Sequence, residues 1–186
     1  MNYSEQFDKL FQKIDRPGDE SLYNYLSQKS DFFTAPASSQ YHLNVEGGLM
    51  QHSVNVANTM LKLNETFQTG FSESTLILCG LLHDICKANY YAKEFRNVKE
   101  NGNWVQKPMY VIKDQLPLGH GAKSVMMLMQ HIKLSTEEML AITWHMSKWD
   151  IAEGQIRTLN AALEYSQLVV LLQLADVAST HILERE

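Results

Sequence analysis

The sequence predicts an all-α protein, a single helical bundle that carries one small inserted β-hairpin. Apolar residues recur at helical spacing in several segments, beginning with residues 4–14. Near residues 90–113 the pattern changes, because aromatic and β-branched residues flank Asn101-Gly102, a pair typical of a hairpin turn. The 186 residues are 45% hydrophobic and 20% charged, which is the composition of an ordinary globular chain.

The N-terminal part is expected to hold two short helices. The first covers residues 4–14, and a Pro-Gly pair ends it. Asp19 is positioned to cap a second helix that reaches about Gln28. Residues 30–40 are small and polar and include a proline, so we expect a loop that leads into the core. We therefore predict N-terminal helices over residues 1–40 that pack on a main domain over residues 41–186.

The main domain is expected to place helices before and after the hairpin, which would serve as a rim or lid. The segment TLILCGLLHDICK follows a cap at Ser72 or Ser74 and is apolar nearly all round, so we expect it to be central. Ser135 begins a later helix with capping chemistry. The expected helices of this domain cover residues 48–64, 75–87, 118–132, 135–145 and 159–183, with a turn at 147–154.

Charge and cysteine content exclude several classes of protein. The formal net charge of -5 gives no general attraction for long nucleic acid. Cys79 and Cys86 lie in one apolar stretch and form no disulfide framework, which fits a reduced setting. The chain begins without the pattern of a signal peptide. Its longest apolar run, residues 168–178, is interrupted by Gln173 and Asp176, whereas a membrane span needs roughly 20 apolar residues. We expect a cytoplasmic protein with no membrane partner.

Histidine and aspartate interrupt the apolar helical faces at four positions. His52 points inward with its apolar neighbours, His83-Asp84 ends the most apolar helix, and Asp176 lies deep in the last one. Taken singly, His52 reads as a hydrogen-bonded core residue and Asp176 as a helix cap. Taken together they favour a metal site, because a buried unpaired carboxylate is costly and a cation turns buried acceptors into ligands.

Five segments in order resemble one known family: EGGLMQHSVNVAN, GLLHDICK, GHGAKSV, AITWHM and QLADVAS. The chain resembles the HD-domain superfamily of metal-dependent phosphohydrolases, in particular bacterial members with a stand-alone domain, over roughly residues 41–180. This resemblance implies a helical fold, divalent metals and hydrolysis of phosphate esters, usually of nucleotides or related metabolites. Position by position, it implies a first metal held by His52, His83, Asp84 and Asp176, and a second held by Asp84, His120 and His145.

Two departures from the family pattern bear on the metal site. Cys86 stands where the family commonly has glycine, and it touches no ligand position. Met146 follows His145 where many two-metal members have another histidine, so one metal and two metals both stay open. With a single metal, His120 and His145 become donors to the substrate phosphate or proton carriers.

The candidate catalytic residues are Asp84, as a ligand of the metal that activates water, and Lys87. A metal-bound water loses its proton near pH 7 and can attack phosphorus. Lys87 follows His83 by one helical turn and is expected to clamp the phosphate; the alternative is a lysine that offsets the helix dipole. Weaker substrate-binding candidates are Lys123, His42 and Arg96. Lys148 and Trp149 are further candidates of the same kind. The rings of Tyr90, Tyr91 and Trp104 would either stack on a base or pack across the strands of the hairpin. His131 and His181 are expected to face solvent.

The favoured function is a metal-dependent phosphohydrolase acting on a small phosphate ester or a nucleotide. One alternative is a non-catalytic nucleotide-binding sensor, which would usually have lost a ligand position that this chain keeps. Another is a 3′–5′ nuclease on short oligonucleotides, which the net charge disfavours. The ligand types accommodate iron, manganese, nickel, cobalt, zinc or magnesium, as one or two ions. The sequence specifies neither the substrate nor the oligomeric state.

Overall fold

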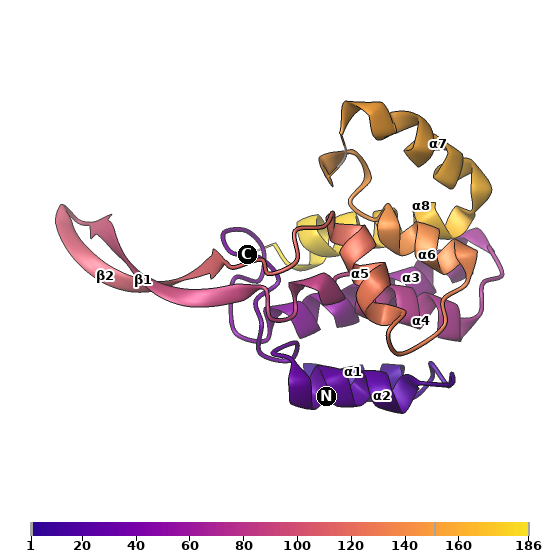
Figure 1. The fold of residues 1–186 in the computed structure, drawn as a ribbon, viewed down its shortest axis with the longest axis horizontal. Helices are drawn as coiled ribbons and strands as arrows, with labels where there is room; N and C mark the ends of the chain where they lie inside the picture. Colours follow the sequence, from indigo (N-terminus) through magenta and orange to yellow (C-terminus); the bar gives the residue numbers. More distant parts are fainter. Residues whose placement is uncertain (1, 151, 186) are drawn as a thin grey trace.

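The computed structural model describes residues 2–150 and 152–185. It confirms the all-α class: a helical body carries one two-stranded arm (Figure 1). The helices are α1 (Tyr3–Phe11), α2 (Asp19–Asn24), α3 (Gly48–Phe67), α4 (Glu73–Leu82), α5 (His120–Leu128), α6 (Thr136–Thr143), α7 (Ile156–Tyr165) and α8 (Gln167–Ala178). The strands are β1 (Tyr91–Glu100) and β2 (Asn103–Ile112). Short helical turns include the 3₁₀ turn η2 (Ile85–Lys87) and the π-helical turns η1 (Tyr25–Lys29) and η5 (Ser179–Leu183).

The starts of α4 and α6 follow from their capping residues. The Ser72 side chain accepts a hydrogen bond from the backbone N–H of Thr75, at 3.2 Å. At α6 the Ser135 hydroxyl accepts from the N–H of Glu138, whose carboxylate accepts in return from the N–H of Ser135. Both caps satisfy N–H groups that have no partner within their helix, and both were expected from the sequence.

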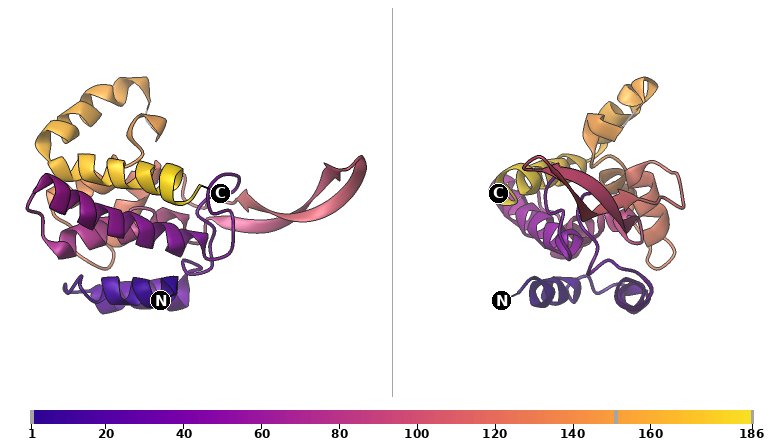
Figure 2. Two further views of the ribbon diagram at one scale, coloured as in Figure 1. Left: turned by 180° about the vertical axis from the view of Figure 1, so that it is seen from behind. Right: turned by 90° about the vertical axis from the view of Figure 1, so that its left-hand side faces the viewer.

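Helix α4 is the centre of the body, as its apolar sequence predicts. All its residues from Leu76 to Leu82 are buried. It packs against α3, which in turn lies beside α8 (Figure 2). At the crossing of α3 and α4 the two backbones touch: a Cβ added to Gly80 would lie 2.4 Å from the Cα of Ala57. Only glycine allows this approach, which fixes the spacing of the two helices.

The N-terminal helices form a layer along one side of the body (Figure 1). Helix α1 contacts α3 and α4. Just after α1, Arg16 donates two hydrogen bonds, of 2.8 and 2.6 Å, to the carboxylate of Glu138 at the start of α6. Glu138 is buried and also accepts from the hydroxyl of Thr75 on α4, at 2.9 Å. One ion pair therefore ties three parts of the chain together. The division of the chain near residue 40 stays a prediction.

The predicted hairpin is present and points away from the helical body (Figures 1 and 2). Strands β1 and β2 pair antiparallel, with Glu100 opposite Asn103 across the turn. Asn101 and Gly102 have φ values of 48° and 85°, and positive φ at both central residues is what a tight hairpin turn of this hand requires.

The prediction of one long helix over residues 159–183 is wrong. The chain bends by 108° between α7 and α8. Ser166 at the break has extended backbone angles, and its hydroxyl caps α8 by accepting from the N–H of Leu168, at 3.2 Å. The same hydroxyl donates to Glu137 on α6, at 2.7 Å. A serine side chain that satisfies the backbone in this way competes with helix continuation. Within the described residues no single helix has the length and apolar character of a membrane span; only α7 and the segment Gln167–Leu183, taken jointly across the bend, meet that criterion.

The expectation that His131 faces solvent is also wrong. Its ring is half-buried against Tyr25, with ring centroids 5.2 Å apart, and its Nδ1 lies 2.9 Å from the hydroxyl of Ser21. The N-terminal layer covers His131, which follows α5, and no periodicity within α5 could reveal this contact. His181 is exposed, as expected.

Candidate metal centre

Asp84 is the centre of a polar cluster buried among the helices. Helix α4 ends at Leu82, and the chain turns sharply through His83 and Asp84 into η2. Both residues are almost completely buried, with 0% and 2% of their surfaces exposed. The structure brings all the expected ligand positions to this point: His52 from α3, His83 and Asp84 after α4, His120 at the start of α5, His145 after α6 and Asp176 from α8.

The two carboxylate oxygens of Asp84 face different histidines. Oδ2 lies 3.5 Å from Nε2 of His83 and 3.8 Å from Nε2 of His52. Oδ1 lies 3.4 Å from Nε2 of His145 and 3.6 Å from Nε2 of His120. Two ligand atoms that are each about 2.1 Å from a tetrahedral ion lie about 3.4 Å apart. The spacing therefore suits ligands that share a cation.

Hydrogen bonds to the backbone fix the orientation of two of these rings. Nδ1 of His83 donates to the carbonyl of Gly80 at 2.9 Å, and Nδ1 of His145 donates to the carbonyl of Ile142 at 2.7 Å. Because a carbonyl only accepts, a neutral ring carries its proton on Nδ1 and directs the lone pair of Nε2 at Asp84. Both Nε2 atoms and Oδ1 of Asp84 are buried and make no hydrogen bond to any described residue. A cluster of buried acceptors without donors fits a cation.

The protonation states also suit a metal. Burial lowers the pKa of His83 to about 4, so the ring is neutral. Burial alone would raise the pKa of Asp84, but Lys87 and His83 hold it well below its usual range. Burial likewise opposes charge on His52, yet Asp176 and Glu184 raise its pKa to about 9. A cation at Nε2 of His52 would displace that proton, as metals do at histidine ligands.

Lys87 faces the same cluster. Because α4 ends at Leu82, Lys87 lies in η2 and not on the helix, and its ammonium group is 2.7 Å from Oδ2 of Asp84. It is buried, with 8% of its surface exposed. Burial alone would lower the pKa of Lys87, but the neighbouring Asp84 raises the pKa by more, so the ammonium group is charged. A buried lysine paired in this way carries positive charge into the site.

The weaker candidates divide into two groups. Lys123 is buried near the site, but Asp114 already pairs with its charge, and its ammonium group lies 4.8 Å from the ring centroid of Tyr90. Tyr90 and Tyr91 are half-buried at the base of the arm. The structure does not bring the remaining candidates to the cluster: Arg96 and Trp104 are exposed on the arm, and Lys148 and Trp149 are exposed after α6.

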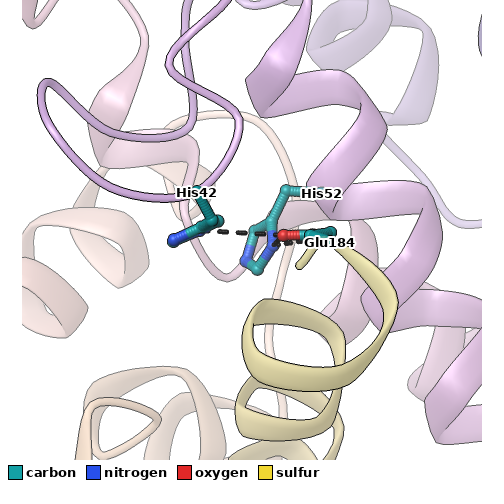
Figure 3. Close-up of side chains that lie close together, drawn as sticks. All are labelled: His42, His52 and Glu184. Carbon is teal, nitrogen blue, oxygen red and sulfur yellow. Dashed lines mark hydrogen bonds and ion pairs between the residues drawn. The ribbon is translucent and has the colours of Figure 1, made fainter. Parts of the chain in front are cut away.

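Glu184 joins the cluster, although it was not among the residues predicted from the sequence. Its carboxylate oxygens lie 3.0 and 3.1 Å from Nδ1 of His52, and it accepts a hydrogen bond of 2.9 Å from the amide of Asn55 (Figure 3). Nε2 of His42 lies 3.8 Å from Oε2 of Glu184. The signal in the sequence is only that Glu184 follows Asp176 by about two helical turns.

Comparisons with known proteins identify the family of this chain. The HD domain family matches residues 49–180, more than two thirds of the chain, and the chain belongs to this family. The resemblance to HD-domain phosphohydrolases is therefore confirmed, and with it a family of metal-dependent enzymes. His42 and Glu184 lie outside the matched residues.

Among characterised proteins, the chain is similar to a dihydroneopterin 2′,3′-cyclic phosphate phosphodiesterase of Methanocaldococcus jannaschii. The two are 40% identical over 65 residues, which is 32% of this chain and 26% of that protein. The chain thus matches about a quarter of the length of this relative. No solved structure matches the chain.

Proposed function

We propose that this protein hydrolyses a phosphate ester of a small metabolite or nucleotide, using one or two divalent metal ions bound around Asp84. The observation that carries the proposal is the set of four histidine Nε2 atoms that lie 3.4–3.8 Å from the Asp84 carboxylate. Among these atoms, Nε2 of His83 and Nε2 of His145 are buried and make no hydrogen bond to a described residue, which is typical of metal ligands.

The division of the histidines between the two Asp84 oxygens supports a pair of metal positions. His52, His83 and Asp176 would complete the first position with Oδ2, and His120 and His145 would complete the second with Oδ1. A bound divalent ion supplies hydroxide near neutral pH by lowering the pKa of its water to about 7. Asp84 would bridge the two positions, while His83 and His145 are held ready by their bonds to the backbone.

Lys87 is the residue that would bind the phosphate. Phosphoryl transfer places negative charge on the non-bridging oxygens, and a buried ammonium group stabilises that charge more than an exposed one does. Among the lysines considered as candidates, the ammonium group of Lys87 lies against Asp84 itself, whereas that of Lys123 pairs with Asp114. The name of the archaeal relative describes a cyclic phosphodiester substrate, so we include cyclic phosphodiesters among the candidate substrates.

Two alternatives have different signatures. A nucleotide sensor would bind a nucleotide and a metal without turnover, and the full set of ligand positions disfavours it. A nuclease on short oligonucleotides would share the chemistry but show activity that falls steeply with salt. The net charge of -5 disfavours such a substrate.

The test combines metal loading with turnover. Protein stripped of metal is titrated with Mn²⁺, Fe²⁺, Zn²⁺ and Mg²⁺, and hydrolysis of bis-p-nitrophenyl phosphate, cyclic nucleotides and nucleoside monophosphates is followed. We expect the wild type to bind one or two ions and to cleave a member of this panel. Asp84→Ala should lose both properties, with turnover reduced by at least about 10²-fold. Glu65→Ala removes an exposed carboxylate on α3 and is the control. Metal binding without any turnover would favour the sensor.

A further inference from the structure

Glu184 makes the hydrogen bond that leaves a single nitrogen of His52 for the metal. The carboxylate is buried and has no proton to donate, so the bond runs from Nδ1–H of His52 to Glu184. The opposite nitrogen, Nε2, then faces Asp176 at 3.2 Å and Asp84 at 3.8 Å. The tautomer and the plane of the His52 ring are therefore set by a residue far along the chain.

His52 differs in this respect from the other oriented histidines. His83 and His145 donate to carbonyl groups within three residues of themselves, so their own turns orient them. His52 lies in the second turn of α3, where the backbone carbonyls are used by the helix itself. It needs an acceptor from another element, and a carboxylate is a stronger acceptor than a carbonyl because it is charged. A carboxylate behind a histidine ligand also raises the basicity of the ring.

The end of α8 is built to deliver this acceptor. The chain continues into the π-helical turn η5, closed by a bond of 3.0 Å from the N–H of Glu184 to the carbonyl of Ser179. The extra residue in such a turn changes the direction of the side chains that follow, and π turns occur often at functional sites. Turn η5 contacts α3, where the amide of Asn55 holds Oε1 of Glu184 at 2.9 Å. Figure 3 shows the carboxylate of Glu184 beside the His52 ring, with His42 directed toward the same pair.

We infer that Glu184 is a positioning residue that orients His52 for the metal and couples η5 to metal binding. This inference rests on the proposed function. Because coupling is reciprocal, a metal that Glu184 helps to bind must in turn stabilise Glu184 and the turn that carries it. Glu184 lies outside residues 49–180, which match the HD domain, whereas His52 and Asn55 lie within them, so Glu184 supports the matched region from outside it.

A separate ion held by His42, His52 and Glu184 is the competing interpretation of the same group. Their ligand atoms lie within 4.8 Å of one another. That arrangement would require Nδ1 of His52 to lose its proton while Nε2 also binds a cation. The bond of 3.0 Å between His52 and Glu184 favours the positioning role.

The test measures metal affinity and protection of the turn in the full chain. Mn²⁺ binding to metal-free protein is measured by calorimetry for the wild type, Glu184→Ala, Glu184→Gln and Asn55→Ala. We expect Glu184→Ala to weaken binding roughly 10–100-fold, the loss usual for a partner behind a histidine ligand. Glu184→Gln and Asn55→Ala should lose less, since an acceptor for Nδ1 is retained. Arg185→Ala, an exposed neighbour, should bind as the wild type does.

Hydrogen exchange supplies a second measurement that a merely structural residue would not affect. Mn²⁺ should slow exchange at residues 179–185 in the wild type, leave residues 101–103 at the hairpin turn unchanged, and lose its effect on η5 in Glu184→Ala. Unchanged Mn²⁺ affinity in a folded Glu184→Ala protein overturns the inference while leaving the proposed function intact. If that variant does not fold, unchanged affinity in both Glu184→Gln and Asn55→Ala overturns it equally.

Two further outcomes separate this inference from its alternatives. An additional Mn²⁺ equivalent that disappears in His42→Ala would assign the group to a separate ion and overturn the positioning role. A wild-type protein that binds no divalent ion at all would overturn the proposed function itself. Each result is read from the stoichiometry of the calorimetric titration.

Discussion

The helical body and the hairpin arm use charged residues in opposite ways. In the body, two ion pairs have buried members: Lys87 pairs with Asp84, and the partly exposed Arg16 pairs with the buried Glu138. In the arm, charged residues remain exposed and pair in solvent, as Lys113 does with Glu94 at 3.1 Å. A buried charge is costly unless its partner is in place, whereas an exposed pair contributes little. In this chain, therefore, a charged residue contributes to function or stability mainly where it is buried.

The largest difference between body and arm is expected for two lysine substitutions. Lys87→Met keeps an apolar stem of similar length but removes the buried charge that would bind the phosphate. We expect kcat to fall by about 10²-fold, the effect of removing one electrostatic donor. Mn²⁺ affinity should be maintained or improved, because a cation next to the ligand Asp84 is removed.

Lys93→Met on the exposed face of β1 should change kcat by less than about twofold. Steady-state kinetics of the two variants measure both changes in kcat. Equal losses of kcat in Lys87→Met and Lys93→Met would contradict the difference between body and arm.

The next largest effect is expected on stability, from two glutamate substitutions. Glu138→Gln leaves Arg16 without its charged partner and weakens the network that joins α1, α4 and α6. We expect the free energy of unfolding to fall by about 2 kcal/mol, less than for a fully buried pair because Arg16 stays partly exposed. Glu94→Gln in the arm should cost no more than about 0.5 kcal/mol. Urea unfolding of the two variants measures both values. A loss in the arm as large as that in the body would contradict the comparison.

The pH dependence of stability should follow from the same pair. Burial alone would raise the pKa of Glu138, but hydrogen bonds from Arg16 and Ser135 lower it below its ordinary value of 4.5. The stability that depends on this charge is therefore complete above pH 4.5 and lost as the pH falls through the lower pKa of the folded state. The difference in unfolding free energy between the wild type and Glu138→Gln should shrink below pH 4.5. A difference that stays constant down to pH 3 would contradict this assignment.

The smallest effects are expected at the exposed residues of the arm. Arg96→Ala and Trp104→Ala should each change turnover by less than about twofold and the unfolding free energy by less than about 0.5 kcal/mol. Arg96 was a candidate for substrate binding from the sequence, and the structure leaves it exposed on β1. A tenfold rise in KM for Arg96→Ala would mean that the arm reaches the substrate, which would make it the lid that the sequence predicts.

The sequence predicted His52, His83, Asp84 and Asp176 because each of them interrupts an apolar pattern, whereas His120 and His145 were expected only from the resemblance to the HD-domain family. A polar residue in such a pattern is buried by its neighbours, and burial demands a partner. Glu184 gave no such signal, since two further charged residues follow it directly and its contact with His52 spans 132 positions. The pair of Arg16 and Glu138, which are 122 positions apart, was missed for the same reason. Long-range contacts between polar residues leave no periodicity in either partner.

Element types were predicted better than the points where elements end. The hairpin turn was found because Asn101-Gly102 satisfies a local backbone requirement. The break at Ser166 was missed because apolar residues continue across it on both sides. What decides the break is the hydroxyl of Ser166, which caps α8 and donates to Glu137 on a different helix. A local pattern can propose a helix, but a contact with another element determines where it stops.

The touching backbones of Gly80 and Ala57 have a consequence for cation size. With 2.4 Å between the Cα of Ala57 and a Cβ built on Gly80, the helices that carry His52 and His83 are already as close as their backbones allow. The gap between those two rings therefore has a lower limit that side-chain repacking does not change. To bind an ion of smaller radius, the rings of His52 and His83 have to rotate toward it. To bind a larger ion, α3 and α4 have to move apart. Gly80→Ala would raise that lower limit and shift the preference of the site toward larger cations.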